Sequence, residues 1–244
     1  MATAPRTDQL QLLEVAQLDA QLSRLRRDDE RHPLRTEIGE LMNLVAAKSR
    51  DISQTEQDLA TAEKALRSAS AKTADMAAAI SEKEHRLQSG TGMDSRQLLT
   101  LQSEIATQRE MLDELTEAEF AALEKTEALE TQLAELGAQR DVLNERIVTG
   151  RSELEDASAQ IQGEIAQLQT ERAALYLPLA ESLRREYERA QASGGLAVIA
   201  VHPNGETSGG MQLSPIEVAA IKNADPDQIN ISDEYNCIVV LLDA

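Results

Sequence analysis

The side chains that could carry out chemistry are few in this sequence and far apart. Histidine occurs only at His32, His85 and His202, and cysteine only at Cys237. No nucleophile stands beside a candidate base, and no glycine-rich phosphate loop joins a strand to a helix. A single cysteine also excludes an intramolecular disulfide and a multi-cysteine metal site. We therefore predict a protein that is not an enzyme and that carries no cofactor and no metal.

The composition is that of long helices rather than of a compact core. Aromatic residues make up 2% of the 244 residues, tryptophan is absent and phenylalanine occurs once. Leucine, alanine and isoleucine mixed with glutamate, glutamine and arginine are typical of coiled coils. The formal net charge of −19 disfavours phosphate backbones, so nucleic acid is not the expected partner. No apolar run approaches the ~20 residues of a membrane span, and we expect a cytoplasmic protein without membrane contact.

Apolar residues recur at steps of three and four over residues 38–87 and 98–175, after a shorter helical segment at residues 8–31. Two arms of similar length around a short break predict an antiparallel coiled-coil hairpin over residues 1–192. The paired residue numbers should sum to about 183–185 if the break is the centre of the hairpin. Pro33 then faces Gly150, and we expect a kink there. A parallel dimer is disfavoured because the break would interrupt a continuous rod, and weak homo-oligomerisation is kept as an alternative.

The break itself, residues 88–95, is the predicted tip of the hairpin. Two glycines stand close together there, and the aspartate and serine that follow can cap the next helix. We expect this exposed turn to contact a protein partner through Ser89, Gly90, Gly92, Met93, Asp94 and Arg96.

The residue pattern changes from helical to β-like after a linker at residues 192–195. A β-like run at residues 196–201 is followed by turn residues, and Ser214-Pro215 opens a short helix. Residues 228–231 and 237–242 are predicted to form two further strands. Residues 193–244 therefore form a small α+β module of about fifty residues, which would bury little surface alone and should dock on the base of the hairpin.

These features together resemble a bacterial C4-type zinc-ribbon family that carries a long N-terminal helical hairpin. The resemblance is carried by residues 86–91 and 96–105 at the tip, by residues 175–190 with Pro178, Leu183 and Tyr187, and by the layout of residues 197–242. The family holds zinc with two Cys-x-x-Cys pairs. The resemblance places these four positions at Glu206, Gly209, Ser232 and Tyr235 of this chain, and an alternative alignment places the first pair at Ser208 and Met211. It therefore implies a zinc-ribbon-like module without zinc ligands.

The leading hypothesis is a non-enzymatic adaptor whose tip and C-terminal module are presented to protein partners. The resemblance implies a partner in transcription, such as a sigma factor, or in flagellar assembly. Nucleic-acid binding through the module is a first alternative, but Lys222 is the only basic residue there against seven acidic ones. An RNA polymerase secondary-channel factor is a second alternative. It would need Asp94, with Glu82 and Glu84, to hold a metal at the tip, whereas Asp94 is better explained as a helix cap.

Overall fold

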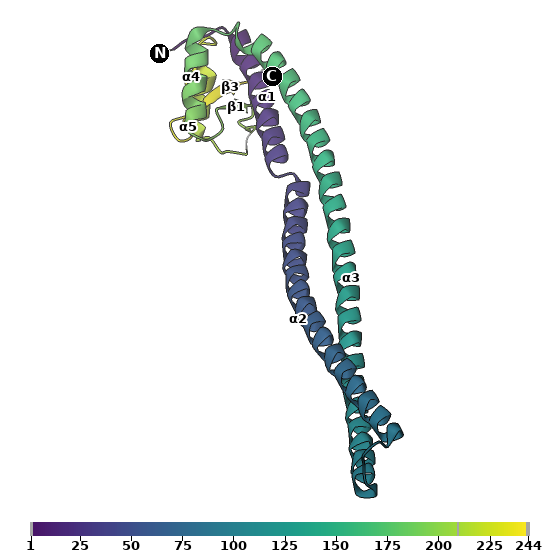
Figure 1. Cartoon of the computed structure of the whole chain (residues 1–244). Coiled ribbons are helices and arrows are strands. Elements are labelled where there is room, and N and C mark those ends of the chain that lie inside the picture. Colours follow the sequence, from purple (N-terminus) through teal and green to yellow (C-terminus); the bar gives the residue numbers. More distant parts are fainter. Residues whose placement is uncertain (1, 209, 243–244) are drawn as a thin grey trace. The chain divides into compact units, whose positions relative to one another are not determined.

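The protein is mainly α-helical in the computed structural model, which describes residues 2–208 and 210–242 (Figure 1). The long helices come first: α1 (Arg6–Glu30), α2 (Pro33–Ser89), α3 (Ser95–Tyr176) and α4 (Glu181–Ala192). The C-terminal part contains β1 (Val198–Val201), α5 (Pro215–Asn223), β2 (Asn230–Ile231) and β3 (Ile238–Leu241). The predicted fold class, a long helical hairpin with a small α+β module, is confirmed. In the described residues, no helix combines the length and the apolar character needed to cross a membrane.

The chain divides into two compact units. One unit comprises Thr36–Arg151, in which α2 and α3 run antiparallel on either side of the tip. The other unit comprises Met1–Arg35 and Ser152–Ala244. It groups α1 and the end of α3 with α4 and the C-terminal strands, so the small module lies in the same unit as the base of the hairpin.

The seam of the unit Thr36–Arg151 is narrow, as expected of a two-helix coiled coil. Its buried side chains all occupy positions that the heptad pattern assigns to the interface: Ile38, Leu41, Thr55, Ala62, Ile80, Leu101, Ile105, Thr126, Leu136 and Ile147. Between these buried residues lie exposed and half-buried positions. Burial is therefore spread along the helices instead of being concentrated in one core.

The pairing register of the two arms differs from the prediction. Thr73 Oγ1 donates to the backbone oxygen of Leu115 at 3.4 Å, and a Cβ built on Gly150 would lie 3.4 Å from Ile38 Cγ1. The residue numbers of both pairs sum to 188, so the predicted register is wrong and Gly150 packs against Ile38. The prediction placed the centre of pairing at the middle of the loop. The register is instead set by interdigitation of the apolar side chains along the seam.

The first arm is interrupted between Glu30 and Pro33, whereas α3 is continuous from Ser95 to Tyr176. A proline suits the first turn of a new helix because it needs no N–H partner there. Asp29 ties this break to α3, since its carboxylate accepts hydrogen bonds from Ser158 Oγ at 2.8 Å and from Gln162 Nε2 at 3.0 Å. The bond from Ser158 is the main reason why the pKa of Asp29 is lowered.

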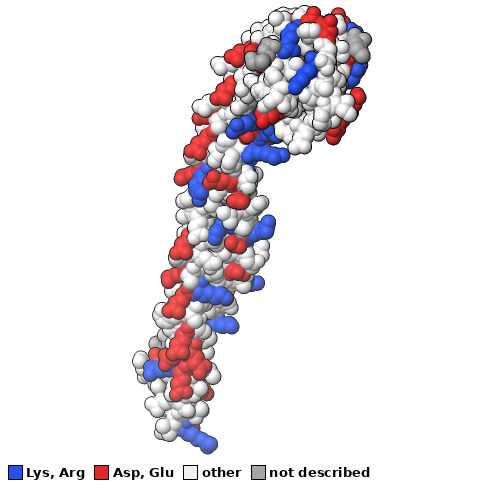
Figure 2. Space-filling view, turned by 180° about the vertical axis from the view of Figure 1, so that it is seen from behind, with Lys and Arg blue, Asp and Glu red and all other residues white. Residues whose placement is uncertain are grey.

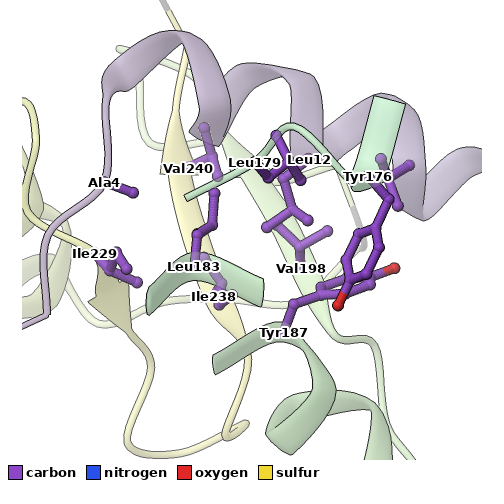
Figure 3. Close-up of a cluster of buried hydrophobic side chains, with 11 residues drawn as sticks. Ala4, Leu12, Tyr176, Leu179, Leu183, Tyr187, Val198, Ile229, Ile238 and Val240 are labelled. Atoms are coloured by element: carbon purple, nitrogen blue, oxygen red, sulfur yellow. The ribbon is translucent and has the colours of Figure 1, made fainter. Parts of the chain in front are cut away.

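The C-terminal strands form a sheet in the order β1-β3-β2, with β1 parallel and β2 antiparallel to β3. Alternate side chains of β1 and β3 enter two different clusters, because successive residues of a strand point to opposite faces. Val198, Ile238 and Val240 join Leu12, Leu183 and Tyr187 on one face (Figure 3). The other face is covered mainly by Ile221 of α5 and by Met211, Leu213 and Tyr235. The module therefore docks on α1, α4 and the end of α3, as its small size requires.

Candidate functional site

The tip is a loop of residues 90–94 between the end of α2 and the start of α3. Gly90 and Gly92 have φ angles of +56° and +78°, a region that residues with a side chain rarely adopt. The backbone N–H of Gly90 donates to the Arg86 carbonyl at 3.3 Å and closes the last turn of α2. The hydroxyl of Ser89 donates to the same carbonyl at 2.9 Å. Glycines at these two positions therefore allow the chain to reverse within five residues.

A reciprocal capping box begins α3. The N–H of Asp94 donates to Gln97 Oε1 at 2.9 Å, and the N–H of Gln97 donates to Asp94 Oδ1 at 2.8 Å. These two bonds satisfy backbone donors that a helix start would otherwise leave unpaired. The predicted capping role of Asp94 is thus confirmed. The described residues contain no group of three or more His, Cys, Asp or Glu side chains that could hold a metal.

Met93 fixes the tip loop to the seam between α2 and α3. It is half-buried and packs against the cluster of Ile80, Leu101 and Ile105. Of the predicted contact residues, Ser89, Gly90, Gly92, Asp94 and Arg96 are exposed, whereas Met93 points into the seam. Its part in presenting the tip is therefore structural, because an apolar side chain lowers its free energy by leaving water.

A shallow groove runs beside the loop between α2 and α3. Its lining includes Lys83, Arg86, Arg96 and Glu104. Lys83 Nζ and Glu104 Oε2 lie 2.8 Å apart, and the hydrogen bond from Lys83 lowers the pKa of Glu104. Arg86 and Arg96 are exposed, and neither forms an ion pair within the described part of the chain. Figure 2 shows acidic and basic side chains interspersed along the helical surface, with a basic side chain at the lower end.

The groove therefore carries a local excess of positive charge. Three basic side chains and one acidic side chain line it, in a chain whose formal net charge is −19. Leu99, one turn into α3, is 66% exposed. The sequence prediction included Arg96 and missed Arg86 and Lys83. The heptad spacing could have indicated both, because it places Lys83 at a seam position and Arg86 one turn later on the same side of the helix.

The positions that the resemblance assigns to zinc do not fit that metal. Glu206 Oε2 accepts a hydrogen bond from Asn204 Nδ2 at 2.9 Å, and the hydroxyl of Tyr235 lies 3.4 Å from the carbonyl oxygen of Gln212. Ser232 is fully buried and its hydroxyl has no hydrogen-bond partner among the described residues. Gly209 lies outside the described residues. A serine, a tyrosine and one glutamate do not supply the four soft ligands of a structural zinc site.

Apolar side chains fill the space between the two turns that carry the expected zinc-ligand positions. Met211 and Tyr235, one from each turn, pack against the buried cluster of Ile199, Val201, Ile221, Cys237 and Val239. The turn before β3 keeps a left-handed residue, Asn236 with a φ angle of +53°. Burial raises the pKa of the Cys237 thiol, which favours its neutral form. The module is thus held together by its hydrophobic cluster and its backbone hydrogen bonds.

A polar network at the base of the hairpin was not predicted from the sequence. The carboxylate of Asp19 accepts hydrogen bonds from Arg172 Nε at 2.5 Å, Arg172 Nη2 at 3.0 Å, Tyr187 Oη at 2.8 Å and Gln191 Nε2 at 2.8 Å. The Arg172 guanidinium also lies 4.5 Å from the centre of the Tyr176 ring. Burial, followed by the hydrogen bond to Glu188, raises the pKa of Tyr176 to about 12. The network joins α1, α3 and α4, and the side chains of Asp19, Arg172, Tyr187 and Gln191 bind one another in it, so we assign it a structural role.

Comparison with known proteins agrees with this architecture. Residues 15–195 match the CT398-like coiled coil hairpin domain. None of the curated proteins matches the chain. A solved structure from Mycobacterium smegmatis is 20% identical, with a TM-score of 0.67 over 98% of this chain and 99% of the other.

Two further structures share the fold. CT398 from Chlamydia trachomatis is 16% identical, with a TM-score of 0.67 over 97% of this chain and 98% of the other. The HP0958 protein from Helicobacter pylori is 14% identical, with a TM-score of 0.52 over the full length of both chains. At these identities the similarity demonstrates the fold alone. The match over most of the chain, together with the observed hairpin, means that the protein belongs to the CT398-like coiled coil hairpin family.

Proposed function

We propose that the protein is a non-enzymatic, cytoplasmic adaptor whose hairpin tip binds a protein partner. The observation that carries this proposal is the tip groove: two exposed arginines that form no ion pair with any described residue lie beside a loop that hydrogen bonds close at both ends. Arginine is enriched in protein interfaces because its guanidinium forms several hydrogen bonds and packs its flat face against apolar atoms. A fixed loop also loses little conformational entropy on binding.

The chemistry of the groove selects an acidic partner surface. Arg86 and Arg96 line the groove and would pair with carboxylates of the partner. A nucleic acid is disfavoured because its phosphates would approach a chain with a formal net charge of −19. The partner we propose is therefore a protein with aspartate or glutamate side chains on its contact surface.

The resemblance to the zinc-ribbon family supports a finer version of this proposal. In that version the C-terminal module is a ribbon that has exchanged its metal for apolar packing, and the partner belongs to transcription or to an assembly process. The fit of Met211 and Tyr235 on the cluster around Cys237 supports the first part. The second part rests on the family resemblance alone.

Reversing the charge of the tip tests the proposal. We would replace Arg86 and Arg96 by Glu and compare partner capture with wild type by quantitative mass spectrometry. The matched control replaces Arg50 and Lys125 by Glu, because both are exposed, form no ion pair in the described residues and lie in the same unit. Captured partners should be lost with the tip variant and kept with the control variant. Equal capture by the two variants would contradict a binding role for the tip, and binding of the purified partner would then be titrated directly.

A further inference from the structure

The edge of the C-terminal sheet carries an open strand. β2 is an outer strand in the order β1-β3-β2, and its residues Asn230 and Ile231 pair with Val239 and Ile238 on one side only. On the other side, the N-terminal segment covers part of this edge, since the Ile229 N–H donates to the Ala2 carbonyl at 3.0 Å. Backbone groups of successive strand residues point alternately to the two sides. The N–H and C=O of Ile231 therefore point away from β3, and no described residue hydrogen-bonds to them through its backbone.

A groove runs along this open edge. It lies between α5 and α4, and its apolar lining includes Ile216, Ile221, Ile229 and Ile231. Two of these are well exposed for isoleucine: Ile216 at 83% and Ile231 at 44%. Exposed β-branched side chains beside unpaired backbone groups are the arrangement that strand addition by a peptide uses.

The rim of the groove is acidic. Its charged residues are Glu186, Glu217, Asp233 and Glu234, and no lysine or arginine is among its lining residues. Glu186 is already paired with Arg189 at 2.8 Å, whereas the other three form no ion pair in the described part of the chain. One oxygen of Glu217, Oε1, is enclosed and has no hydrogen-bond partner there.

We propose that this groove binds an extended, lysine- or arginine-bearing segment of a partner protein, which adds a strand beside Ile231. The open backbone edge requires an extended peptide rather than a helix. The carboxylates require positive charge and repel nucleic acid. A second copy of this chain is a poor occupant, because its residues 193–244 contain a single basic residue. The groove differs from the tip in charge and in partner chemistry. The proposed peptide binding can therefore be tested independently of the proposed role of the tip.

Peptide binding to the full chain tests the groove. The probe is a fluorescein-labelled peptide of alternating lysine and valine, followed by fluorescence anisotropy at low salt. Two comparison peptides carry glutamate in place of lysine, or N-methyl groups on the amides of one edge. The basic peptide should bind and the acidic one should not. The N-methylated peptide keeps its charge but cannot form a ladder, so it should bind at least about fivefold more weakly.

Two variants locate the binding. Replacing Glu217 and Glu234 by Gln and Asp233 by Asn should weaken binding about tenfold, the combined effect expected of three ion pairs at the surface. The matched control replaces the exposed Glu153, Glu155 and Glu164 of α3 by Gln and should change binding less than about twofold. Ile231→Pro removes only an outward-pointing N–H, which an edge strand tolerates, and should abolish the preference for the unmethylated peptide.

Several results would overturn the proposal. One is equal weakening in the groove variant and the control variant, which would mean attraction to the acidic surface as a whole. A second is equal affinity for the methylated and unmethylated peptides. A third is no binding of the basic peptide at millimolar protein. Sedimentation showing a dimer that Ile231→Pro dissociates would assign the edge to a second copy and reject a peptide partner.

Discussion

Asp19 is predicted to be the most sensitive polar residue at the base of the hairpin. Its side chain is 21% exposed and that of Arg172 is 24% exposed, so water reaches both only in part. Hydrogen bonds to charged groups contribute about 1.5–3 kcal/mol each when they are well shielded. Asp19→Asn keeps the size and one acceptor but removes the charge that balances Arg172. We expect the free energy of unfolding to fall by about 2 kcal/mol, and by about 3 kcal/mol for Asp19→Ala, because partial exposure offsets part of the loss.

Urea denaturation followed by two signals measures this effect. All three tyrosines, Tyr176, Tyr187 and Tyr235, lie in the unit that contains Asp19, so tyrosine fluorescence reports on that unit. Circular dichroism reports on all the helices. The fluorescence transition should move to lower urea in Asp19→Asn, and the two signals should separate if the unit Thr36–Arg151 unfolds independently.

A control on the same helix separates the network from a general charge effect. Asp28 lies 3.7 Å from Arg24, and their side chains are 58% and 79% exposed. Asp28→Asn should therefore change stability by less than about 0.5 kcal/mol. If Asp19→Asn also stays within about 0.5 kcal/mol of wild type, the reasoning that assigns stability to this network is refuted.

Four further predictions follow from single features of the structure. Burial, and then the bond to Asp19, raises the pKa of Tyr187. Because tyrosine ionises near pH 10 in the unfolded chain, stability should fall as the pH rises above about 10, and Tyr187→Phe should flatten this fall in urea titrations. Gly137→Ala should raise the free energy of unfolding by about 1 kcal/mol, since alanine favours a helix and a Cβ there meets no atom within 4 Å. Ser232→Ala should also stabilise the protein, by about 1 kcal/mol in the same assay, because it removes a buried hydroxyl without a partner. Cys237 is buried with a raised thiol pKa, so a disulfide reagent should label it only as the protein unfolds, and rapid labelling of the native protein would contradict its packing.

Local patterns made the hairpin predictable. The heptad positions of Ile38, Ile80 and Leu136 identify the buried seam because burial in a two-helix coiled coil depends on spacing within one helix. The capping role of Asp94 could also be predicted, since its partner Gln97 is three residues away. The strands around Val198 and Ile238 were recognisable from their β-branched residues.

Contacts between distant segments were not predictable in the same way. The register was misjudged because it depends on how two arms interdigitate, as Thr73 and Leu115 do, rather than on the midpoint of the loop. The Asp19 network joins residues more than 150 positions apart, and no local pattern links an aspartate of α1 to Arg172. The open edge beside Ile231 depends on the strand order, which places β2 on the outside of the sheet.

The sequence by itself determined the helices, their apolar seam, the glycine turn with its cap and the change to strands after the linker. These features follow from interactions between neighbours in the chain, where spacing and side-chain type are sufficient. Only the tertiary structure decided that Arg86 and Arg96 line one groove, that Met93 faces inward and that Met211 and Tyr235 pack on one cluster. Each of these depends on bringing distant residues to within a few ångströms, which the packing of the whole unit determines.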